Sequence, residues 1–472
     1  MIDFTTVCNM PRLLAALEAH CHRQVMLRWL EGSQVAELTG SAFFSQVRRC
    51  AHGLKEQNLS GKHVSLMGAN RSQWLVHFCA LYLIGAVPVL MSPDLNPTEL
   101  AEKVVLADVE FIFHDETIPV ALPGATMDRS YEQYPDTPLP CPDPNPDELA
   151  CILFTSGTTT AGKAVMLSHR AMVAGSCHNV VSHPFDAQLA ILPMHHVAGF
   201  ATVLNTWYLG RVVCLGQDFK YLYRYLELLE PDYVLTVPSI LQAILRKVNR
   251  GTCWNLKLIG CGGAKFQPEV IQALNDRGIR ILQSYGATEA GGLGFDWEMT
   301  PQCRNTIGKP CPEIEIKIVG GELWLRSASV MSGYYKDPEA TAAVLHDGWY
   351  ATGDLCIQED DGYLRLTGRK NNLIILGNGE NVSPEEIEIR LSACSAISEI
   401  LVGLEQNLIT AAIYPTDSAE ETKEQIRGAI TAYNRGVPPY KQLQNLRFSD
   451  EPFPKNAVGK IIRRSVTEGE SQ

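Results

Sequence analysis

The chain has 472 residues, of which 46% are hydrophobic and 19% are charged. This composition supplies ample apolar material for a core, so it excludes a disordered chain, a fibrous chain and a small disulfide-stapled scaffold. The 40 Lys and Arg residues against 52 Asp and Glu residues give a net charge of −12. An acidic chain is a poor electrostatic match for nucleic acid or an anionic membrane, although a local basic patch is compatible with this charge.

The cysteines and the apolar runs indicate a cytoplasmic protein. Fourteen cysteines are scattered singly, without a CxxC pair or a His/Cys cluster at metal-ligand spacing, so we expect free, mostly buried thiols in a reducing compartment. The segment Met1–Met10 lacks the basic and apolar regions of a signal peptide. The longest apolar run, Phe78–Met91, is interrupted by Gly85 and Pro88 and is shorter than the ~20 residues that span a bilayer. We therefore expect a soluble protein without a membrane span.

Apolar strand-like runs alternate with amphipathic helix-like runs over the first two thirds of the chain. The predicted helices are Ser41–Gln57, Arg71–Ile84, Gly199–Leu209, Tyr221–Leu229, Ser239–Val248 and Pro268–Arg277. The predicted strands are His63–Gly68, Val87–Met91, Leu149–Phe154, Leu189–Pro193, Val212–Leu215, Tyr233–Val237, Leu256–Cys261 and Ile281–Tyr285. This alternation predicts an α/β fold of parallel-rich sheets covered by helices. In such sheets ligands bind beyond the carboxyl ends of the strands.

Two changes of pattern divide the chain. Six prolines between Pro135 and Pro146 predict an extended linker over residues 135–147. From about Thr306 to Thr367 short β runs separated by glycines predict a β-rich subdomain. Beyond Arg369 we expect a small α+β unit. The predicted β runs are Glu313–Val319, Glu322–Arg326, Tyr350–Ile357 and Tyr363–Leu366, and the last predicted helices lie near Pro384–Ala393 and Glu420–Asn434.

A loop rich in hydroxyl and glycine residues follows the strand Leu149–Phe154. It reads Thr155-Ser156-Gly157-Thr158-Thr159-Thr160-Ala161-Gly162-Lys163-Ala164. Small residues let backbone N–H groups approach a phosphate, hydroxyls donate to it, and an ammonium neutralises its charge. A flexible polar turn is an equal alternative for this loop taken alone. A P-loop NTPase is disfavoured, because the position after Lys163 requires Ser or Thr and holds Ala164.

The segment Tyr285-Gly286-Ala287-Thr288-Glu289 ends another predicted strand. It combines an aromatic face for a base, a hydroxyl for a phosphate and a carboxylate for Mg²⁺ within five residues. An exposed turn explains the segment less well, because Tyr285 and Glu289 flank a glycine after a buried run.

Taken together, the motifs resemble the adenylate-forming superfamily of acyl-CoA synthetases, peptide-synthetase adenylation domains and luciferases. The loop Thr155–Lys163 is similar to the phosphate loop of that superfamily, which usually has Gly, Pro and Gly at the positions of Thr160, Gly162 and Ala164. The other matching segments occur in the order of the superfamily; they are Leu192–Gly199, Cys261–Ala264, Tyr285–Glu289, Gly348–Leu355, Gly368–Asn372, Gly377–Glu388 and Pro454–Ile461.

The resemblance implies roles for individual residues. The catalytic residues would be Lys460, Thr288, Glu289 and His196, with Glu289 as the ligand of Mg²⁺. The nucleotide would be held by Thr155, Ser156, Gly157, Thr158, Thr159, Lys163, Gly263, Ala264, Tyr285, Gly286, Asp354 and Arg369. The thiol-acceptor loop would contain Gly377, Gly379 and Glu380, and the acyl pocket would contain His196, Phe200, Trp207, Gly286 and Gly292.

Several of these segments also have plainer explanations. Lys460 alone is typical of a surface lysine in a basic tail, and His196 alone is typical of a buried or capping histidine. Cys261–Ala264 fits a glycine-rich turn between strand and helix. Ser383 is expected to cap the helix that begins at Pro384, with Glu386 at the capping-box position.

The resemblance implies an N-terminal AMP-binding and acyl-binding domain of residues 1–368 and a mobile C-terminal domain of residues 369–472 that carries Lys460, with the hinge at Arg369–Asn371. It implies ATP-dependent activation of a carboxylic acid to an acyl-adenylate, release of pyrophosphate, and transfer of the acyl group to the thiol of coenzyme A. ATP, Mg²⁺ and coenzyme A are the expected cofactors.

Alternatives remain for the acceptor and for the class of protein. A phosphopantetheinyl carrier protein is the alternative acceptor. A non-catalytic nucleotide-binding relative is disfavoured because Lys460 and Gly459 are both present. An amino-acid substrate is disfavoured because residues 194–197 contain no acid, and the compact length favours aryl-acid or o-succinylbenzoate-type ligases.

Overall fold

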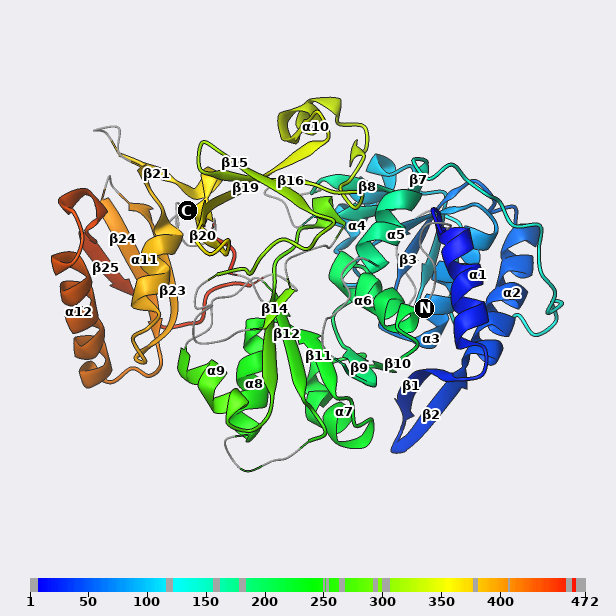
Figure 1. The fold of residues 1–472 in the computed structure, drawn as a ribbon, viewed down its shortest axis with the longest axis horizontal. Coiled ribbons are helices and arrows are strands. Elements are labelled where there is room, and N and C mark those ends of the chain that lie inside the picture. Colours follow the sequence, from blue (N-terminus) through cyan, green and yellow to red (C-terminus); the bar gives the residue numbers. More distant parts are fainter. Residues whose placement is uncertain are drawn as a thin grey trace.

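The computed structural model describes residues 7–115, 122–155, 162–177, 184–248, 251, 254–262, 268–291, 296–298, 306–376, 381–405, 408–455 and 461–463. These residues form the expected mixed α/β fold, in which two large parallel-rich sheets lie beside a smaller antiparallel sheet and a C-terminal α+β unit (Figure 1). The C-terminal unit occupies one end of the molecule, and the N-terminal helices occupy the other.

The first large sheet is mostly parallel and buried. Its strand order is β17-β8-β7-β4-β3-β5-β6, and only its pairs β7–β8 and β8–β17 are antiparallel. Parallel strands covered on both faces need continuous apolar runs, and β3, β4 and β7 have such sequences. The strands are β3 (His63–Met67), β4 (Val87–Leu90), β5 (Phe111–His114), β6 (Gly124–Thr126), β7 (Leu149–Phe154), β8 (Ala164–Ser168) and β17 (Gly333–Tyr334).

The second large sheet has the strand order β14-β13-β12-β11-β9-β10-β1-β2. Its six central strands are parallel, and each edge carries an antiparallel partner. The strands are β1 (Val25–Glu31), β2 (Gln34–Thr39), β9 (Ala187–Ala190), β10 (Val212–Leu215), β11 (Tyr233–Thr236), β12 (Leu258–Gly262), β13 (Arg280–Ser284) and β14 (Asp296–Glu298).

Helices from the first half of the chain join the two large sheets through one hydrophobic core. This core contains side chains from both sheets and from the helices α1 (Met10–Cys21), α2 (Gly40–Glu56), α3 (Ser72–Leu83), α5 (His169–Cys177) and α6 (Val197–Tyr208). The outer faces of the two sheets are covered by α4 (Pro97–Leu106), α7 (Leu222–Leu228), α8 (Pro238–Val248) and α9 (Pro268–Asn275). The sheets are therefore fixed relative to each other by burial of apolar surface.

The third sheet is antiparallel and lies between the large sheets and the C-terminal unit (Figure 1). Its strands are β15 (Glu315–Val319), β16 (Glu322–Arg326), β18 (Leu345–His346), β19 (Trp349–Gln358) and β20 (Leu364–Arg369), and α10 (Pro338–Val344) lies beside it. The β-rich character expected for residues 306–367 is confirmed.

The C-terminal unit has its own hydrophobic core. It contains β21 (Ile374–Ile375), β22 (Asn381–Val382), α11 (Pro384–Leu391), β23 (Ile397–Glu405), β24 (Leu408–Pro415), α12 (Glu420–Arg435) and β25 (Asn445–Phe448). Ser383 caps α11 as expected, since its hydroxyl accepts a hydrogen bond from the Glu386 N–H. The Glu386 carboxylate pairs with Lys441 Nζ at 2.8 Å. The domain boundary at residue 368 stays a prediction.

Other expectations concern segments without regular structure. Residues 135–147 contain neither helix nor strand, and their role as a linker stays a prediction.

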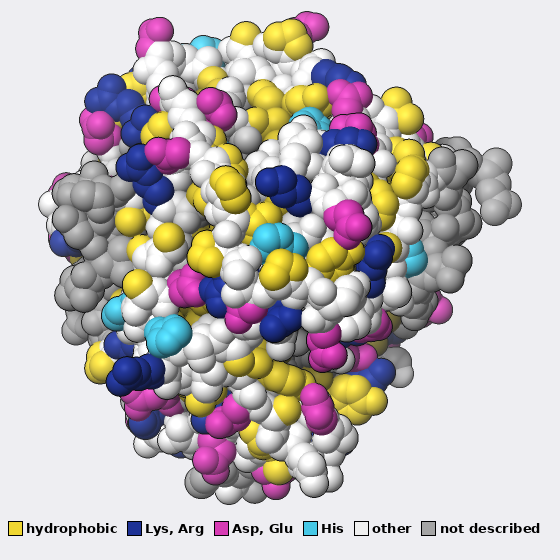
Figure 2. All heavy atoms as spheres, turned by 90° about the vertical axis from the view of Figure 1, so that its right-hand side faces the viewer, with side chains coloured by type: hydrophobic (Ala, Val, Ile, Leu, Met, Phe, Trp, Pro, Cys, Tyr) yellow, Lys and Arg dark blue, Asp and Glu magenta, His cyan; other side chains and the backbone are white. Residues whose placement is uncertain are grey.

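No described helix is long and apolar enough to cross a membrane. On the face at the right-hand side of Figure 1, described Lys and Arg side chains are interspersed with Asp and Glu (Figure 2).

Candidate functional site

The expected site residues that the structure describes follow the carboxyl ends of strands from both large sheets. Thr155 follows β7, His196 follows β9, and Tyr285 follows β13. Parallel strands direct their carboxyl ends to one edge, which is the usual location of ligand sites in such sheets.

Three predicted nucleotide-binding side chains meet at a buried carboxylate. The Tyr285 hydroxyl donates to Asp354 Oδ2 at 2.6 Å, and Arg369 Nε lies 2.7 Å from Asp354 Oδ1. Asp354 and Arg369 are paired residues of the antiparallel strands β19 and β20, so the sheet itself brings them together. The Asp354 side chain is only 7% exposed, whereas half of the Arg369 side chain is exposed. The buried carboxylate therefore has a donor on each oxygen, one of them the charged Arg369 guanidinium.

The protonated state of Tyr285 follows from its surroundings. Burial, and then the adjacent Asp354 carboxylate, raise the pKa of Tyr285 well above its ordinary value. The phenol therefore remains a hydrogen-bond donor at neutral pH, and its ring lies at the end of β13 with only 8% of the residue exposed.

The backbone before Asp354 is fixed by a second buried carboxylate. Gly353 has a φ of +72° and donates its N–H to Glu322 Oε1 at 2.9 Å. The Thr352 hydroxyl donates to the Leu323 carbonyl at 2.7 Å and accepts the Asp354 N–H at 3.0 Å. Lys370 Nζ lies 2.9 Å from Glu322 Oε2. The turn that presents Asp354 is thus held in place before any ligand arrives.

The described ends of the predicted phosphate loop are closed by two hydrogen bonds. The Thr155 N–H donates to the Lys163 carbonyl at 3.1 Å, and the Lys163 N–H donates to the Thr155 hydroxyl at 3.4 Å. Gly162 has a φ of +68°, and a Cβ atom there would lie 2.4 Å from the Thr155 carbonyl oxygen. Only glycine fits that position. Ser156, Gly157, Thr158 and Thr159 lie outside the described residues.

Glu289 lies close to this loop. It belongs to the 3₁₀ turn η2 (Thr288–Ala290), where Thr288, Glu289 and the preceding Ala287 are half-buried and Gly286 is exposed. The Tyr334 hydroxyl donates to Glu289 Oε1 at 3.0 Å, and the Met331 N–H donates to the Glu289 carbonyl at 2.8 Å. Lys163 Nζ lies 4.5 Å from the centroid of the Tyr334 ring.

The donor set at Glu289 fits a magnesium ion that arrives with nucleotide phosphates. Mg²⁺ prefers hard oxygen ligands and usually takes one or two carboxylates, with phosphates and water completing its shell. Within the described part of the chain, Tyr334 is the one hydrogen-bond donor to the Glu289 carboxylate, which leaves Oε2 for a cation. Among the described residues there is also no cluster of three or more His, Cys, Asp or Glu side chains that could form an all-protein metal cage.

His196 occupies the N-cap position of α6 beside His195. The centroids of the two imidazole rings are 4.4 Å apart, and the His196 side chain forms no capping hydrogen bond. Burial, and then the neighbouring His196, lower the pKa of His195 to about 3, and burial lowers the pKa of His196. Both rings are thus neutral at pH 7. His195 Nδ1 and His196 Nε2 are buried and have no hydrogen-bond partner among the described residues.

The residues predicted for the acyl pocket have separate environments. Phe200 is buried against Phe78, with ring centroids 5.6 Å apart. Trp207 is fully buried, packs on Phe43 and donates its indole N–H to the Met26 carbonyl at 3.1 Å. Trp207 therefore lies in the core between the sheets and is not brought to the site, because its position on α6 faces α2 and β1. Gly292 lies outside the described residues.

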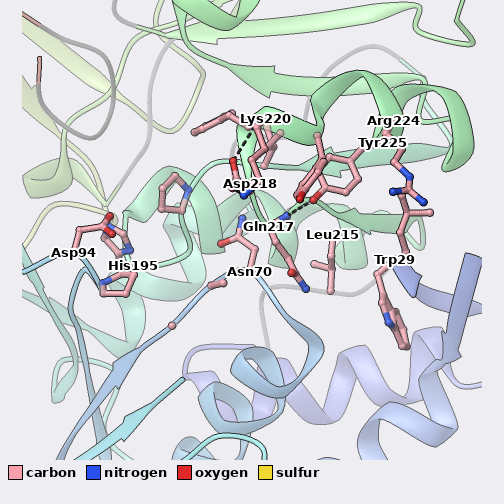
Figure 3. Close-up of a pocket in the computed structure, with 18 of the residues that line it drawn as sticks. Trp29, Asn70, Asp94, His195, Leu215, Gln217, Asp218, Lys220, Arg224 and Tyr225 are labelled. Atoms are coloured by element: carbon pink, nitrogen blue, oxygen red, sulfur yellow. Dashed lines mark hydrogen bonds and ion pairs between the residues drawn. The ribbon is translucent and has the colours of Figure 1, made fainter. Parts of the chain in front are cut away.

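A cavity of about 820 Å³ opens beside the histidine pair, at the carboxyl ends of β3, β4, β9 and β10 (Figure 3). His195 and Asp94 lie toward one end of it, and Trp29 and Arg224 lie toward the other. Asn70 links its walls, because its side-chain amide donates to the Leu192 carbonyl at 2.9 Å and accepts the Met194 N–H at 3.0 Å. None of the predicted site residues lines this cavity.

The predicted catalytic lysine and the thiol-acceptor loop lie outside the described residues, as do Gly263 and Ala264. The residues that flank Lys460 are described. Lys455 and Ile461 form an antiparallel bridge. Arg463 Nη2 lies 2.6 Å from Glu388 Oε2, and the Phe453 N–H donates to Glu399 Oε2 at 2.8 Å. The described residues before position 456 and after position 460 are therefore anchored on β23 and α11.

The sequence analysis did not identify Tyr334, Glu322 or Asn70 as site residues. Tyr334 and Glu322 contact residues 45 and 31 positions away, so neither belongs to a local motif. The sequence offers only weak signals for two of them. Asn70 follows shortly after the buried strand β3, and Tyr334 belongs to a Gly-Tyr pair.

Known proteins resemble this chain in sequence and in fold. Residues 15–335 match the family model of the AMP-binding enzymes, and residues 371–469 match the model of the AMP-binding enzyme C-terminal domain. A 4-coumarate–CoA ligase-like protein of Oryza sativa is 29% identical over 86% of this chain and 82% of the relative. A feruloyl-CoA synthase of Amycolatopsis is 27% identical over 91% of this chain and 93% of the relative. The solved structure of an o-succinylbenzoate coenzyme A synthetase of Bacillus subtilis in complex with AMP has the same fold, with a TM-score of 0.84 and 22% identity over 97% of this chain and 98% of that one.

Proposed function

This chain belongs to the AMP-binding enzyme family, and from that premise we propose that it is an AMP-forming acid–thiol ligase that joins a carboxylic acid to coenzyme A. ATP and the acid would first give an acyl-adenylate and pyrophosphate, and the thiol would then displace AMP. The observation that carries the proposal is the buried Tyr285–Asp354–Arg369 cluster, because it presents an aromatic face, a charged acceptor and a half-exposed guanidinium together.

The ribose of the nucleotide would bind at Asp354. A carboxylate has about four lone-pair sites, and the described contacts of Asp354 use one on each oxygen. The remaining sites accept hydrogen bonds from two adjacent hydroxyls, which is the arrangement that a ribose offers. The Tyr285 ring would contact the base.

The first step joins two anions, so it needs concentrated positive charge at the reacting atoms. Lys163 would hold the pyrophosphate together with Thr155 and the hydroxyls of the phosphate loop. Lys460 would bridge the substrate carboxylate and the α-phosphate, and Thr288 would donate to that phosphate. Bound at Glu289, Mg²⁺ would supply charge neutralisation to the phosphates.

The second step would use a different face of the C-terminal unit. We propose that the unit rotates about Arg369–Asn371, withdraws Lys460 and brings Gly377–Glu380 to the adenylate. Asn371 is exposed, whereas Arg369 and Lys370 on its N-terminal side are tied to the third sheet through Asp354 and Glu322. A pivot at residue 371 therefore leaves the ribose contacts intact.

The acid is proposed to be an aryl acid, and the acceptor is proposed to be free coenzyme A. Coumarate and ferulate are aromatic acids, and the relatives named for them are also named for CoA, which favours CoA over a carrier protein. Burial lowers the pKa of His196, so beside the reacting carboxylate its neutral ring would provide hydrogen bonding without a competing charge. We also propose a cytoplasmic location, which is supported by the twelve free cysteines of the described residues.

ATP–pyrophosphate exchange with a panel of aryl and alkyl carboxylic acids tests the proposal. Exchange with aryl acids at saturating Mg²⁺ is the expected result, and no exchange with any acid would reject the enzymatic function. Lys460→Ala is expected to abolish exchange while transfer from supplied acyl-AMP to coenzyme A continues. The exposed lysine variant Lys55→Ala is the control. An equal loss of both half-reactions would show that Lys460 has another role.

A further inference from the structure

Tyr334 lies between two charged groups that the proposed reaction requires. Its hydroxyl donates to Glu289 Oε1 at 3.0 Å, and Lys163 Nζ stands 4.5 Å from the centroid of its ring. The hydroxyl thus contacts the expected magnesium ligand, while the ring contacts the cation of the phosphate loop. Neither contact involves a ligand, so both exist in the protein alone.

The orientation of Tyr334 is fixed by its strand. β17 pairs with β8, which begins one residue after Lys163, and Tyr334 stands opposite Val165. The Tyr334 N–H donates to the Thr341 hydroxyl at 2.8 Å. The residue is only 5% exposed. A side chain held in this way has little rotational freedom, and it therefore defines the positions of the groups that it contacts.

The strand also connects the two charged segments through their backbones. The Tyr335 N–H donates to the Ala164 carbonyl at 2.7 Å, directly after Lys163, and the Met331 N–H donates to the Glu289 carbonyl at 2.8 Å. Residues 331–335 therefore bridge the phosphate loop and η2. A displacement of one segment would be transmitted to the other through this short strand.

A direct ion pair between Lys163 and Glu289 would oppose the reaction. It would occupy the ammonium that the phosphates need and the carboxylate that the magnesium ion needs. No such pair occurs among the ion pairs of the described residues. The aromatic face attracts the ammonium by a cation–π interaction, and the neutral hydroxyl orients the carboxylate without cancelling its charge.

We propose that Tyr334 is a positioning residue that separates Lys163 from Glu289 and orients both toward a magnesium–nucleotide complex. The inference rests on the proposed function, since it assigns Tyr334 to the same site. It does not depend on the identity of the acid, because the magnesium–nucleotide complex binds before the acid reacts.

Two substitutions separate the two contacts of Tyr334. Tyr334→Phe removes the hydroxyl and keeps the ring over Lys163, whereas Tyr334→Leu removes both contacts. The neighbouring variant Tyr335→Phe is the matched control, because the Tyr335 hydroxyl donates to the carboxylate of Asp108 at the exposed surface. Thermal unfolding of each variant shows whether the fold is retained.

Calorimetric binding of ATP at increasing Mg²⁺ concentration, and of AMP without Mg²⁺, is the readout. For Tyr334→Phe we expect the half-saturating Mg²⁺ concentration to rise about tenfold, with AMP affinity unchanged. For Tyr334→Leu we expect, in addition, weaker binding of pyrophosphate, because Lys163 is no longer held. Tyr335→Phe should behave as the wild type. In a Glu289→Gln background, Tyr334→Phe should cause no further change in Mg²⁺ dependence.

An unchanged Mg²⁺ dependence in Tyr334→Phe would overturn the proposal, and so would an additive effect in the Glu289→Gln background. A lower unfolding temperature with unchanged Mg²⁺ dependence would assign Tyr334 a purely structural role. These outcomes differ from a failure of the proposed function, in which the wild-type protein itself would show no Mg²⁺-dependent binding of ATP.

Discussion

The two carboxylates of the site, Asp354 and Glu289, are held in opposite ways. Asp354 is buried and receives a donor on each oxygen, from Tyr285 and Arg369. Glu289 is half-buried, and within the described residues it receives a single neutral donor on one oxygen. In the first arrangement both oxygens have a donor before any ligand binds, whereas in the second one oxygen is available for a cation.

Because of this difference, one site can bind the ribose and the phosphates of a nucleotide by separate interactions. A carboxylate that has one donor on each oxygen still has a lone pair on each for a neutral diol, so it can bind the diol by hydrogen bonds without an ion. A carboxylate with an available oxygen gains its main partner only when a cation arrives with the phosphates. Binding of AMP should therefore depend on Asp354 and be insensitive to Mg²⁺, while the reaction of ATP should depend on both.

Asp354→Ala is the most damaging change that this comparison predicts. It removes the acceptor for the ribose and the carboxylate that Arg369 and the Tyr285 hydroxyl contact, so AMP affinity should fall about 100-fold. Calorimetric titration with AMP measures this loss. Asp360→Ala, at an exposed aspartate of the same subdomain, serves as the control. An AMP affinity within threefold of the wild type would show that Asp354 does not bind the ribose.

Glu289→Gln should act later in the reaction and more selectively. The amide keeps an oxygen that accepts the Tyr334 hydroxyl but loses the charge that attracts Mg²⁺, so ATP–pyrophosphate exchange should fall about 30-fold. AMP affinity should stay within twofold of the wild type. If AMP binding falls together with exchange, the two carboxylates do not have separate roles.

Much of the fold could be predicted because its strands are continuous apolar runs between glycine and proline signals. Val212–Leu215 coincides with β10, and Leu149–Phe154 coincides with β7. The hairpin β1–β2 was not predicted, because its strands carry the charged residues Arg28 and Glu37, which pair with each other across the exposed edge at 2.8 Å. An edge strand needs fewer apolar residues than a central one, so its pattern is weaker.

The site residues also differ in how strongly the local sequence indicates them. Tyr285, Asp354 and Arg369 stand in local motifs. The register of β19 and β20 pairs Asp354 with Arg369, and the Tyr285 hydroxyl reaches Asp354 from the end of β13. Tyr334 and Glu322 act across distant parts of the chain, so no local spacing predicts them. Trp207 is near a motif along the chain, yet its side chain does not reach the site. Helical rotation, and not distance along the chain, decides that its side chain faces the core.

The buried histidine His195 differs from both carboxylates in its partners. Asp354 is buried with a donor on each oxygen, whereas a buried titratable group that lacks such partners favours its neutral form. His195 is such a group within the described residues, since burial, and then His196, lower its pKa to about 3. Its neutral form is favoured in the folded protein, whereas the unfolded chain binds a proton near pH 6.5.

The stability of the protein should therefore fall as the pH decreases from about 6.5 toward 3, by up to roughly 1.4 kcal/mol per pH unit for each such histidine. Stability falls on acidification because, as the pH decreases, His195 of the unfolded state binds a proton before His195 of the folded state does, and this protonation stabilises the unfolded state. Denaturant unfolding of wild type and His195→Gln at pH 7, 6 and 5 measures the effect, with the exposed His22→Gln as the control. The His195→Gln protein should lose less stability over this range. Parallel curves for wild type and variant would mean that burial does not lower the pKa of His195 in the folded protein.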